Sequence, residues 1–476
     1  MNPAGPPSSP LRAALSALRE RVAGHPDDVG RNELAWLAAR VEAAEAARTW
    51  AASCGDELAM RIADAVEESI LGRDPIELGH QHAAIGQASR PLEDVGMSAG
   101  ARALRARYRA FADREVRPHA EAIHRQNLPV PDSIIDGAAA MGLFDLSSGS
   151  REHMLIATEE LSAASLNAAG SLITRPEILI RALRRAGTPT QRERWLPDIT
   201  SGRRMVAVAV TEPGAGSDVA AMQECRAEPM GSRWRLNGRK RFAGFSGRAE
   251  LMAVLARTNP EGRRGLSLFV VEKPRIDDLD FIHEQPTGGR LVATAIPTLG
   301  YRGMRTYDLL FDDYLTPEDA LVGAEGQGFY LQLEGFTSGR LQTAARAVGV
   351  MQAAVAEAFS YARRREVFGT PIAELQLAQA TLGSMVVRLE SSRRLSYRAA
   401  ASLDRDEGQM VASLAKLYAA HQAETVTRDA MQLHGGIGYT ETQPVSRLFV
   451  DARVLPIFEG AEEVLALRVV ARELLR

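Results

Sequence analysis

The spacing of apolar residues changes twice along this sequence, and that change limits the folds open to it. Leu34, Leu37, Val41 and Ala44 recur at intervals of three and four residues, which predicts an amphipathic helix. Between residues 205 and 311 the apolar runs are short and bounded by Gly, Pro and Asn, as strands are. Beyond this region the helical interval returns. The chain is therefore expected to fold as helices, then a β-domain, then helices again.

The expected fold class is α+β with several domains, because 476 residues exceed what one hydrophobic core usually organises. Helices are expected over residues 11–22, around 34–44, and over 57–71, 101–115, 154–162 and 178–185, while 73–100 is typical of a linker. Strands are expected at 205–211, 234–236, 251–258, 266–272, 292–296 and 308–311, and together they indicate an antiparallel barrel or sandwich. The expected domains are residues 1–95 (N-terminal helical extension and linker), 96–204 (α-helical domain), 205–318 (β-domain) and 319–476 (C-terminal four-helix bundle).

Charge and cysteine usage narrow the classes of function. The formal net charge is −3, which argues against nucleic acid as the main partner. Cys54 and Cys225 form neither a disulfide framework nor a metal-site spacing, so a reducing, cytoplasmic location and no metal are expected. The Pro/Ser-rich residues 1–10 are expected to be a tail and not a signal peptide. No apolar run is long enough to span a membrane.

A carboxylate near the C-terminus is a candidate for proton transfer. Glu459 stands between Phe458 and Gly460, shortly before an apolar helix expected to begin near Glu462. Glycine allows a ligand to approach closely, and an aromatic neighbour can keep water from a carboxylate that acts as a base. An acidic residue near a helix N-terminus is also common without any catalytic role. From these residues alone, the second interpretation is favoured.

Three further stretches allow both a structural and a functional interpretation. Two of them are rich in glycine: residues 211–218 (Thr-Glu-Pro-Gly-Ala-Gly-Ser-Asp) and residues 435–438. Each is either an ordinary turn or a loop that presents N–H groups to a ligand. Residues 363–365, three arginines, either complement a helix dipole or bind a pyrophosphate. His434 is either structural or catalytic.

Together these stretches resemble the acyl-CoA dehydrogenase family. Residues 210–218 are similar to the family's first signature, residues 432–439 to its second, and residues 457–460 to the segment that carries its catalytic base. The resemblance extends over about residues 101–476 and agrees with the order helices, β-domain, helices. It implies an FAD-dependent oxidoreductase that dehydrogenates an acyl-CoA between its α and β carbons.

The sequence resembles one branch of the family, the methylsuccinyl-CoA dehydrogenases, more closely. The matching residues are 299–304, 339–349, 444–447 and 449–455, and that branch also carries an N-terminal helical extension, longer than the one here. The resemblance implies oxidation of (2S)-methylsuccinyl-CoA to mesaconyl-CoA in the ethylmalonyl-CoA pathway. The alternatives are a neutral short branched acyl-CoA, an acyl-carrier-protein thioester, or a non-catalytic flavin-bearing binding protein.

The resemblance also assigns roles to residues. Glu459 would remove the α proton, and Gly339 occupies the position where some members carry the base instead. Arg340, Gly460 and Ser217 would contact the substrate. The residues expected to hold FAD are Val210, Thr211, Ser217, Phe242, Gly244, Arg365, Phe368, Gln376, Gln432, Gly435, Gly436, Ala461 and Glu463, of which Arg365, Phe368, Gln376, Gln432, Gly435 and Gly436 would act across a subunit interface. A homotetramer built as a dimer of dimers and an electron-transferring flavoprotein are the expected partners.

The sequence departs from the family's pattern at Gly244, where a threonine usually bonds the flavin, and in a shortened loop at residues 145–154. The contact at Gly244 would be lost or made by backbone or by Ser246. A buried substrate carboxylate needs a cation, and Arg175 is the candidate, with Arg302 and Arg305 behind it. Arg175 could instead be a surface arginine paired with Glu177.

Overall fold

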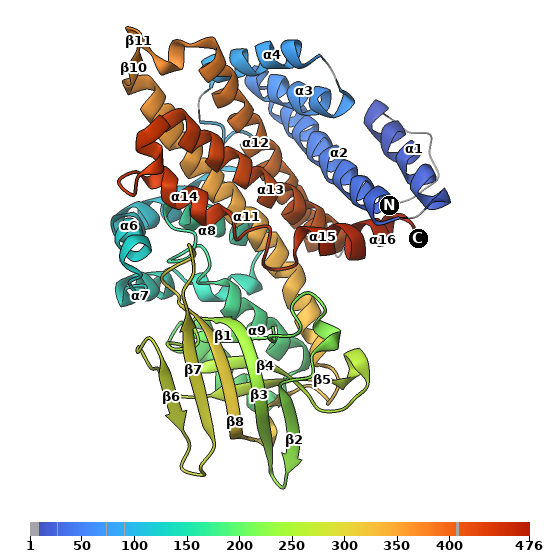
Figure 1. Cartoon of the computed structure of the whole chain (residues 1–476), viewed down its shortest axis with the longest axis vertical. Coiled ribbons are helices and arrows are strands. Elements are labelled where there is room, and N and C mark those ends of the chain that lie inside the picture. Colours follow the sequence, from blue (N-terminus) through green and yellow to red (C-terminus); the bar gives the residue numbers. More distant parts are fainter. Residues whose placement is uncertain (1–8, 26, 73, 90, 406–408) are drawn as a thin grey trace. The chain divides into compact units, whose positions relative to one another are not determined.

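The computed structural model describes residues 9–25, 27–72, 74–89, 91–405 and 409–476 (Figure 1). It contains two compact units, each built from separate stretches of chain. The first, called here the helical unit, comprises residues 1–113, 151–166 and 340–476; the second, the sheet unit, comprises residues 114–150 and 167–339. Most of the tail expected at residues 1–10 lies outside the described residues.

The helical unit begins with three helices that the sequence predicted and that have clear end signals. Asp27 and Asp56 accept hydrogen bonds from N–H groups in the first turns of α2 (Asp28–Cys54) and α3 (Glu57–Leu71). Gly55 and Gly72 end these helices in the left-handed conformation. The elements of this unit are α1 (Pro10–Gly24), α2 (Asp28–Cys54), α3 (Glu57–Leu71), α4 (Pro75–Ala88), α5 (Ala99–Phe111), α8 (Arg151–Ala164), the later part of α11 (Gly328–Arg364), β10 (Glu366–Val367), β11 (Thr370–Pro371), η6 (Ile372–Glu374), α12 (Gln376–Asp404), α13 (Gln409–His434), η7 (Gly435–Tyr439), α14 (Pro444–Ala452), α15 (Glu462–Val464), η8 (Leu465–Val470) and α16 (Ala471–Leu474).

The prediction of a linker over residues 73–100 was wrong for half of that stretch, which forms α4. Gly86 of α4 and Gly383 of α12 face each other's helix so closely that no side chain fits. A Cβ at Gly86 would lie 2.9 Å from the carbonyl carbon of Gln379, and one at Gly383 would lie 2.7 Å from that of His82. The two backbones therefore touch, which a sequence without clear period does not reveal.

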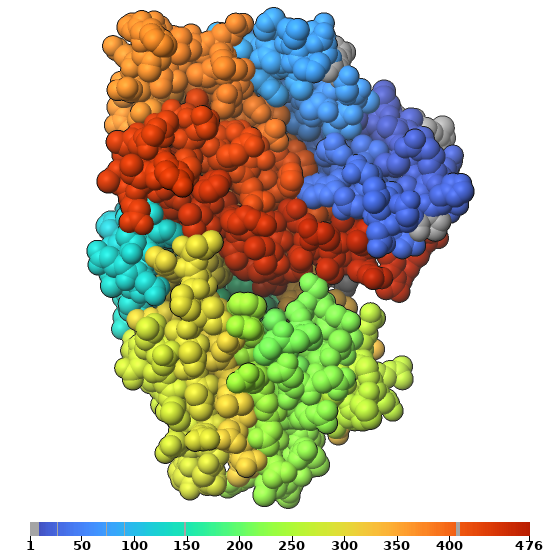
Figure 2. Space-filling view, in the orientation of Figure 1, coloured from blue at the N-terminus to red at the C-terminus, as the bar shows by residue number. Residues whose placement is uncertain are grey.

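The N-terminal helices are part of the bundle's core. In Figures 1 and 2 the blue segment lies against α12 and α13, and α2 and α4 contact α12. Trp50 of α2 is buried, donates from Nε1 to the carbonyl of Val95 at 3.0 Å, and has the guanidinium of Arg394 3.9 Å from its ring centroid. Arg394 also donates to the carbonyl of Leu92 at 3.0 Å. The extension thus packs as an integral layer of the helical unit.

A buried charge network joins three helices inside the same unit. Glu159 of α8 accepts hydrogen bonds from Arg105 of α5 at 3.2 Å and from Arg393 of α12 at 2.9 Å. Burial acts to raise the pKa of Glu159, but the arginines outweigh it and hold that pKa below its ordinary value. Glu390 pairs with Arg393 and, at 2.6 Å, with Arg394. These side chains carry paired charge in the interior, where an unpaired charge would be strongly destabilising.

The sheet unit carries the β-domain. Its strands are β1 (Val206–Ala209), β2 (Arg226–Met230), β3 (Arg233–Gly244), β4 (Leu251–Arg257), β5 (Leu266–Glu272), β6 (Phe281–Glu284), β7 (Arg290–Ile296), β8 (Thr306–Pro317) and β9 (Leu321–Val322). Their order in the sheet is β6-β7-β8-β3-β2-β4-β5-β9, with β1 paired to β4. Pairing is antiparallel as expected, except that β1–β4 and β2–β4 are parallel. The sequence missed β2 and β6 because each buries a single apolar side chain, Ala227 and Phe281.

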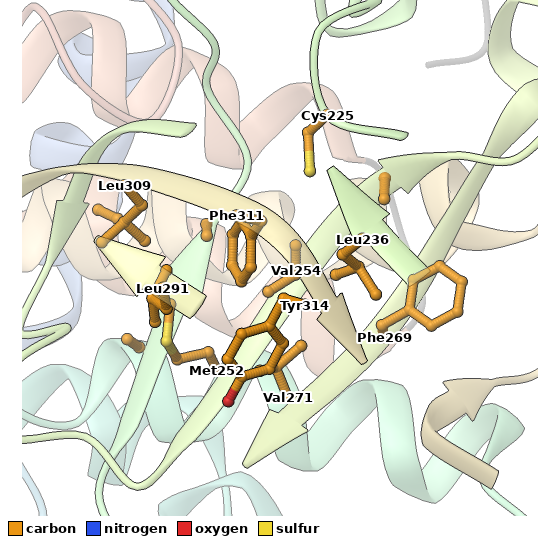
Figure 3. Packing of buried hydrophobic residues seen from close by; sticks show 14 of the residues in the cluster. Cys225, Leu236, Met252, Val254, Phe269, Val271, Leu291, Leu309, Phe311 and Tyr314 are labelled. Carbon is orange, nitrogen blue, oxygen red and sulfur yellow. The ribbon is translucent and has the colours of Figure 1, made fainter. Parts of the chain in front are cut away.

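Helices cover part of this sheet and position the functional residues. The helical elements of the unit are α6 (Arg117–Gln126), α7 (Asp132–Ala140), η2 (Leu143–Ser148), α9 (Thr174–Ala186), α10 (Pro189–Thr200), η3 (Val219–Ala221), η4 (Gly262–Gly265) and η5 (Glu318–Ala320), with η1 (Ala112–Val116) at the unit boundary. Apolar residues of α9 and α10 pack against β1, β4 and β5. The strands carry a second cluster of buried apolar residues. Leu236, Val254, Phe311 and Tyr314 lie together in this cluster (Figure 3).

The expected fold class is confirmed: helical regions flank a β-domain, and an additional helical segment precedes them. Within the described residues, none of the helices combines the length and the apolar character needed to cross a membrane. In the same residues, His, Cys, Asp and Glu side chains form no cluster that could hold a metal ion.

Candidate active site

The segment that carries Glu459 has an unusual backbone. It connects α14 to α15, and both Glu459 (φ 54°) and Gly460 (φ 99°) lie in the left-handed region. A non-glycine residue there is uncommon and is typical of functional sites. The helix itself begins at Glu462, so Glu462 and Glu463 occupy its acidic first turn. Glu459 lies outside that turn, which weakens the interpretation that it only complements the helix dipole.

Glu459 presents unpaired polar atoms. Its Oε2 is buried and has no hydrogen-bond partner, and its N–H donates to no acceptor in the described part of the chain. Buried polar atoms without partners are rare in folded proteins, and in an enzyme they are typical of groups that bind a ligand or take part in catalysis. A free carboxylate oxygen can take a proton, and a free N–H can bind a carbonyl oxygen.

A cation lies near this carboxylate. Arg340 of α11 is buried, donates to Ser413 Oγ at 3.3 Å, and its Nε has no partner in the described residues. Burial lowers the pKa of Arg340, and the negative charge of Glu459 partly offsets this effect. Phe458 lies beneath Arg346, whose guanidinium is 4.8 Å from the ring centroid. Arg340, Glu459 and Gly460, which the sequence assigned to base and substrate, therefore belong to one neighbourhood.

In the sheet unit, the loop 210–218 is held by a buried ion pair that the sequence analysis missed. Lys240 of β3 donates from Nζ to the carbonyl of Val210 at 2.8 Å and to Glu212 at 2.9 Å. Glu212 also accepts the N–H groups of residues 223–225. Burial acts to raise the pKa of Glu212, but Lys240 and these donors hold it below its ordinary value. Lys240 falls at an inward position of a strand, which is the signal that could have identified it.

The pair anchors the base of the loop and leaves its tip exposed. Gly216 and Ser217 are solvent-exposed, whereas Val210 is buried and Thr211 is half-buried. A rigidly anchored loop with an exposed glycine–serine tip can present N–H and hydroxyl groups to a phosphate-bearing or carbonyl-rich ligand. Phe242, at the end of β3, is exposed with φ 58° and offers an open aromatic face.

Arg175 lies directly against Gly244. Its Nη1 is 3.0 Å from Met304 Sδ and 3.5 Å from the carbonyl of Ser171, and in the described residues it forms no ion pair. A Cβ at Gly244 would lie 3.1 Å from the Arg175 Cζ and closer still to Nη2. The guanidinium thus fills space that a side chain at position 244 would need. Ser246 does not take that place, because its hydroxyl donates to the carbonyl of Ala243 at 3.0 Å.

The alternative interpretation of Arg175 is not supported. Glu177 bonds to Arg181 at 2.6 Å and to Ser338 at 2.6 Å, and not to Arg175. The two other candidate arginines are also engaged, each with backbone carbonyls: Arg302 with His124 at 2.8 Å and Arg305 with Asp277 at 2.7 Å.

The remaining expected cofactor residues lie on the surface of the helical unit. Arg365, Phe368 and Gln376 surround the hairpin β10–β11, and Phe368 is fully exposed with φ 51°. In Figure 1 this hairpin and α15 lie at opposite ends of the bundle, so these residues are separate from Glu459 within the same chain. Gln432, Gly435 and Gly436 are exposed at the end of α13, and Ala461 and Glu463 flank the start of α15.

His434 has a structural role. It is buried, its Nδ1 lies 2.8 Å from the carbonyl of Ala430, and its ring stacks on Tyr361 with centroids 4.2 Å apart. This arrangement fixes the last turn of α13, so that Gly435 can follow in the left-handed conformation with φ 62°.

The chain is similar to known proteins over nearly its whole length. Three family models match: the acyl-CoA dehydrogenase N-terminal domain at residues 98–203, the middle domain at 207–314 and the C-terminal domain at 326–475. The chain is 34% identical to (2S)-methylsuccinyl-CoA dehydrogenase of Cereibacter sphaeroides, over 98% of this chain and 95% of that protein. It is 36% identical to mitochondrial 2-methylacyl-CoA dehydrogenase of Solanum tuberosum, over 77% and 88%. The solved glutaryl-coenzyme A dehydrogenase–glutaryl-CoA complex is similar with TM-score 0.74 and 26% identity, over 80% and 97%.

The residues present fit the cofactor of this family, since an anchored loop with an exposed glycine–serine tip and a second exposed pair of glycines are available to a dinucleotide. The chain therefore belongs to the acyl-CoA dehydrogenase family of FAD-dependent oxidoreductases.

Proposed function

We propose that this enzyme oxidises a short, branched, carboxylated acyl-CoA, specifically (2S)-methylsuccinyl-CoA to mesaconyl-CoA. Two observations support this substrate. The relative named for it aligns with 98% of the chain, including the N-terminal extension. Arg175 offers a guanidinium that has no acidic partner among the described residues. It lies beside Gly244, at the position that the resemblance places next to the flavin.

Glu459 acts as the base in this proposal. Its unpaired Oε2 removes the α proton as the thioester oxygen accepts a hydrogen bond from the Glu459 N–H, which stabilises the negative charge that develops there. FAD, held by residues of the loop 210–218, would supply the acceptor for the β hydrogen, which leaves the substrate as hydride. The substrate thereby loses one proton and one hydride, a double bond forms between the α and β carbons, and electrons leave the reduced enzyme to an electron-transferring flavoprotein.

The fully exposed Phe368 supports a second proposal, that another copy of the chain covers the hairpin β10–β11. Phe368 precedes Gly369 in this hairpin, and Leu375 and Leu377, which follow closely in the sequence, are exposed as well. Several large apolar side chains exposed together are typical of a contact surface. Arg365 and Gln376, on either side of it, would then reach the FAD of the neighbouring subunit.

The observation that carries the function is the buried Oε2 of Glu459, which has no hydrogen-bond partner in the part of the chain that the structure describes. The test is Glu459→Gln, which keeps the shape of the side chain but removes the base. The variant should bind FAD and fail to reduce it when the acyl-CoA is added anaerobically, while Glu473→Gln, a substitution in an exposed surface pair, should reduce it normally. Flavin reduction at the wild-type rate in Glu459→Gln would refute the assignment.

A further inference from the structure

A buried lysine donates hydrogen bonds to the backbone of the segment that carries Glu459. Lys416 of α13 is wholly buried, and its Nζ donates to the carbonyl of Pro456 at 3.1 Å and to the carbonyl of Gly460 at 2.7 Å. These two carbonyls lie on either side of Ile457, Phe458 and Glu459. We propose that Lys416 is a positioning residue that fixes the Glu459 carboxylate and N–H for proton removal. The inference rests on the proposed role of Glu459 as the base.

The segment needs such a constraint because its own backbone hydrogen bonds bypass Glu459. One of them, from the N–H of Glu462 to the carbonyl of Pro456 at 3.2 Å, crosses the turn. The N–H groups of Ile457 and Phe458 both donate to Val454, but Glu459 has no backbone hydrogen bond in the described residues. A non-glycine residue held at φ 54° is strained and persists only when its surroundings impose it. Lys416 bonds the carbonyls immediately before and after the turn and so holds both ends at once.

Lys416 lies among charged side chains, which help to determine its protonation state. The carboxylates of Glu459 and Glu462 and the cations of Arg340 and Arg346 surround it. Burial lowers the pKa of Lys416 to about 8, and the two carboxylates oppose this change. The side chain therefore remains an ammonium with three N–H donors at neutral pH, and two of these donors bond the segment.

The chain offers a matched control in Lys273 of the sheet unit. Lys273 is also buried, and its Nζ donates to the carbonyls of Gly247 at 2.7 Å and Pro274 at 3.0 Å. Burial lowers its pKa to about 8 as well. Replacement of either lysine by methionine removes a buried ammonium and its hydrogen bonds to two carbonyls. In each pair one carbonyl, that of Pro456 or that of Gly247, keeps a backbone N–H donor. Of these two lysines, Lys416 alone bonds the segment of Glu459. A difference in activity between the two variants therefore reports the position of Glu459 and not a general loss of stability.

The experiment compares full-length, FAD-loaded wild type with Lys416→Met, Lys416→Arg and Lys273→Met. Flavin reduction at saturating (2S)-methylsuccinyl-CoA should fall on the order of 10²-fold in Lys416→Met, as expected for a misplaced catalytic group. The dissociation constant for acyl-CoA, read from the change in the flavin spectrum, should change little. Lys416→Arg, which keeps the cation and donors, should recover part of the rate, and Lys273→Met should reduce its flavin at the wild-type rate.

Amide hydrogen exchange of the peptide 454–464 provides a readout that needs neither substrate nor bound FAD. Exchange at Glu459 and Gly460 should accelerate in Lys416→Met and not in Lys273→Met. Unchanged exchange there, or wild-type flavin reduction in Lys416→Met, overturns the inference; if Lys416→Met releases its FAD, the exchange result alone decides. Wild-type reduction in Lys416→Met with none in Glu459→Gln would overturn this inference and leave the proposed function intact.

Discussion

Arg175→Met is expected to remove the preference for a carboxylated substrate. In the folded protein the Arg175 guanidinium contacts Met304 Sδ and the Ser171 carbonyl and forms no ion pair among the described residues. Its attraction for a substrate carboxylate is therefore not shared with a protein acid. Truncating one partner of a buried, hydrogen-bonded charge pair costs about 2–5 kcal/mol. At 1.4 kcal/mol per tenfold change, kcat/KM for (2S)-methylsuccinyl-CoA should fall about 30-fold to 4,000-fold.

The assay measures kcat/KM on (2S)-methylsuccinyl-CoA and on isobutyryl-CoA, which is branched but uncharged. Arg175→Met should lose activity selectively on the charged substrate. Gly244→Ala should do so in part, because the added Cβ would lie 3.1 Å from the Arg175 Cζ and closer to Nη2, which displaces the guanidinium.

The control is Arg185→Met on the same helix. Arg185 forms an exposed pair with Glu334, and such pairs contribute little, so both substrates should be oxidised as by the wild type. Equal losses on the two substrates in Arg175→Met, or no loss on either, would refute the reasoning and place the carboxylate elsewhere.

Two further predictions concern stability. Trp50→Ala should destabilise the protein by about 3–5 kcal/mol, as truncation of a buried tryptophan does. The change also removes the contacts with Val95 and Arg394. An unchanged melting temperature would show that the extension is not part of the core. Lys273 has its pKa lowered by burial from 10.5 to about 8, so between these pH values the unfolded chain binds more protons, and stability should rise with pH. Denaturant unfolding at pH 8 and pH 10 should show the stability of the wild type rising relative to Lys273→Met, and a constant or falling difference would contradict the pKa shift.

Local pattern was enough for much of the fold. The intervals of apolar residues in 11–22, 34–44 and 57–71 identified helices that the structure contains, because each helix buries one face and its period repeats within a few turns. The strands 251–258 and 266–272 were identified instead as short continuous apolar runs, because both are buried along their length. Helix α4 was missed because its packing depends on Gly86 and Gly383, which are distant in sequence and carry no side chain.

The sequence by itself determined the order of the domains, the family and the glutamate that matches its base, because these are encoded in contiguous residues. Only the tertiary structure decided what surrounds them. Lys416 is joined to the segment of Glu459, and Lys240 to Glu212, by contacts across long stretches of chain. The space left by Gly244 is filled by Arg175 from another element. Such contacts have no period and no motif, because a hydrogen bond or a steric exclusion depends on distance in space and not on separation along the chain.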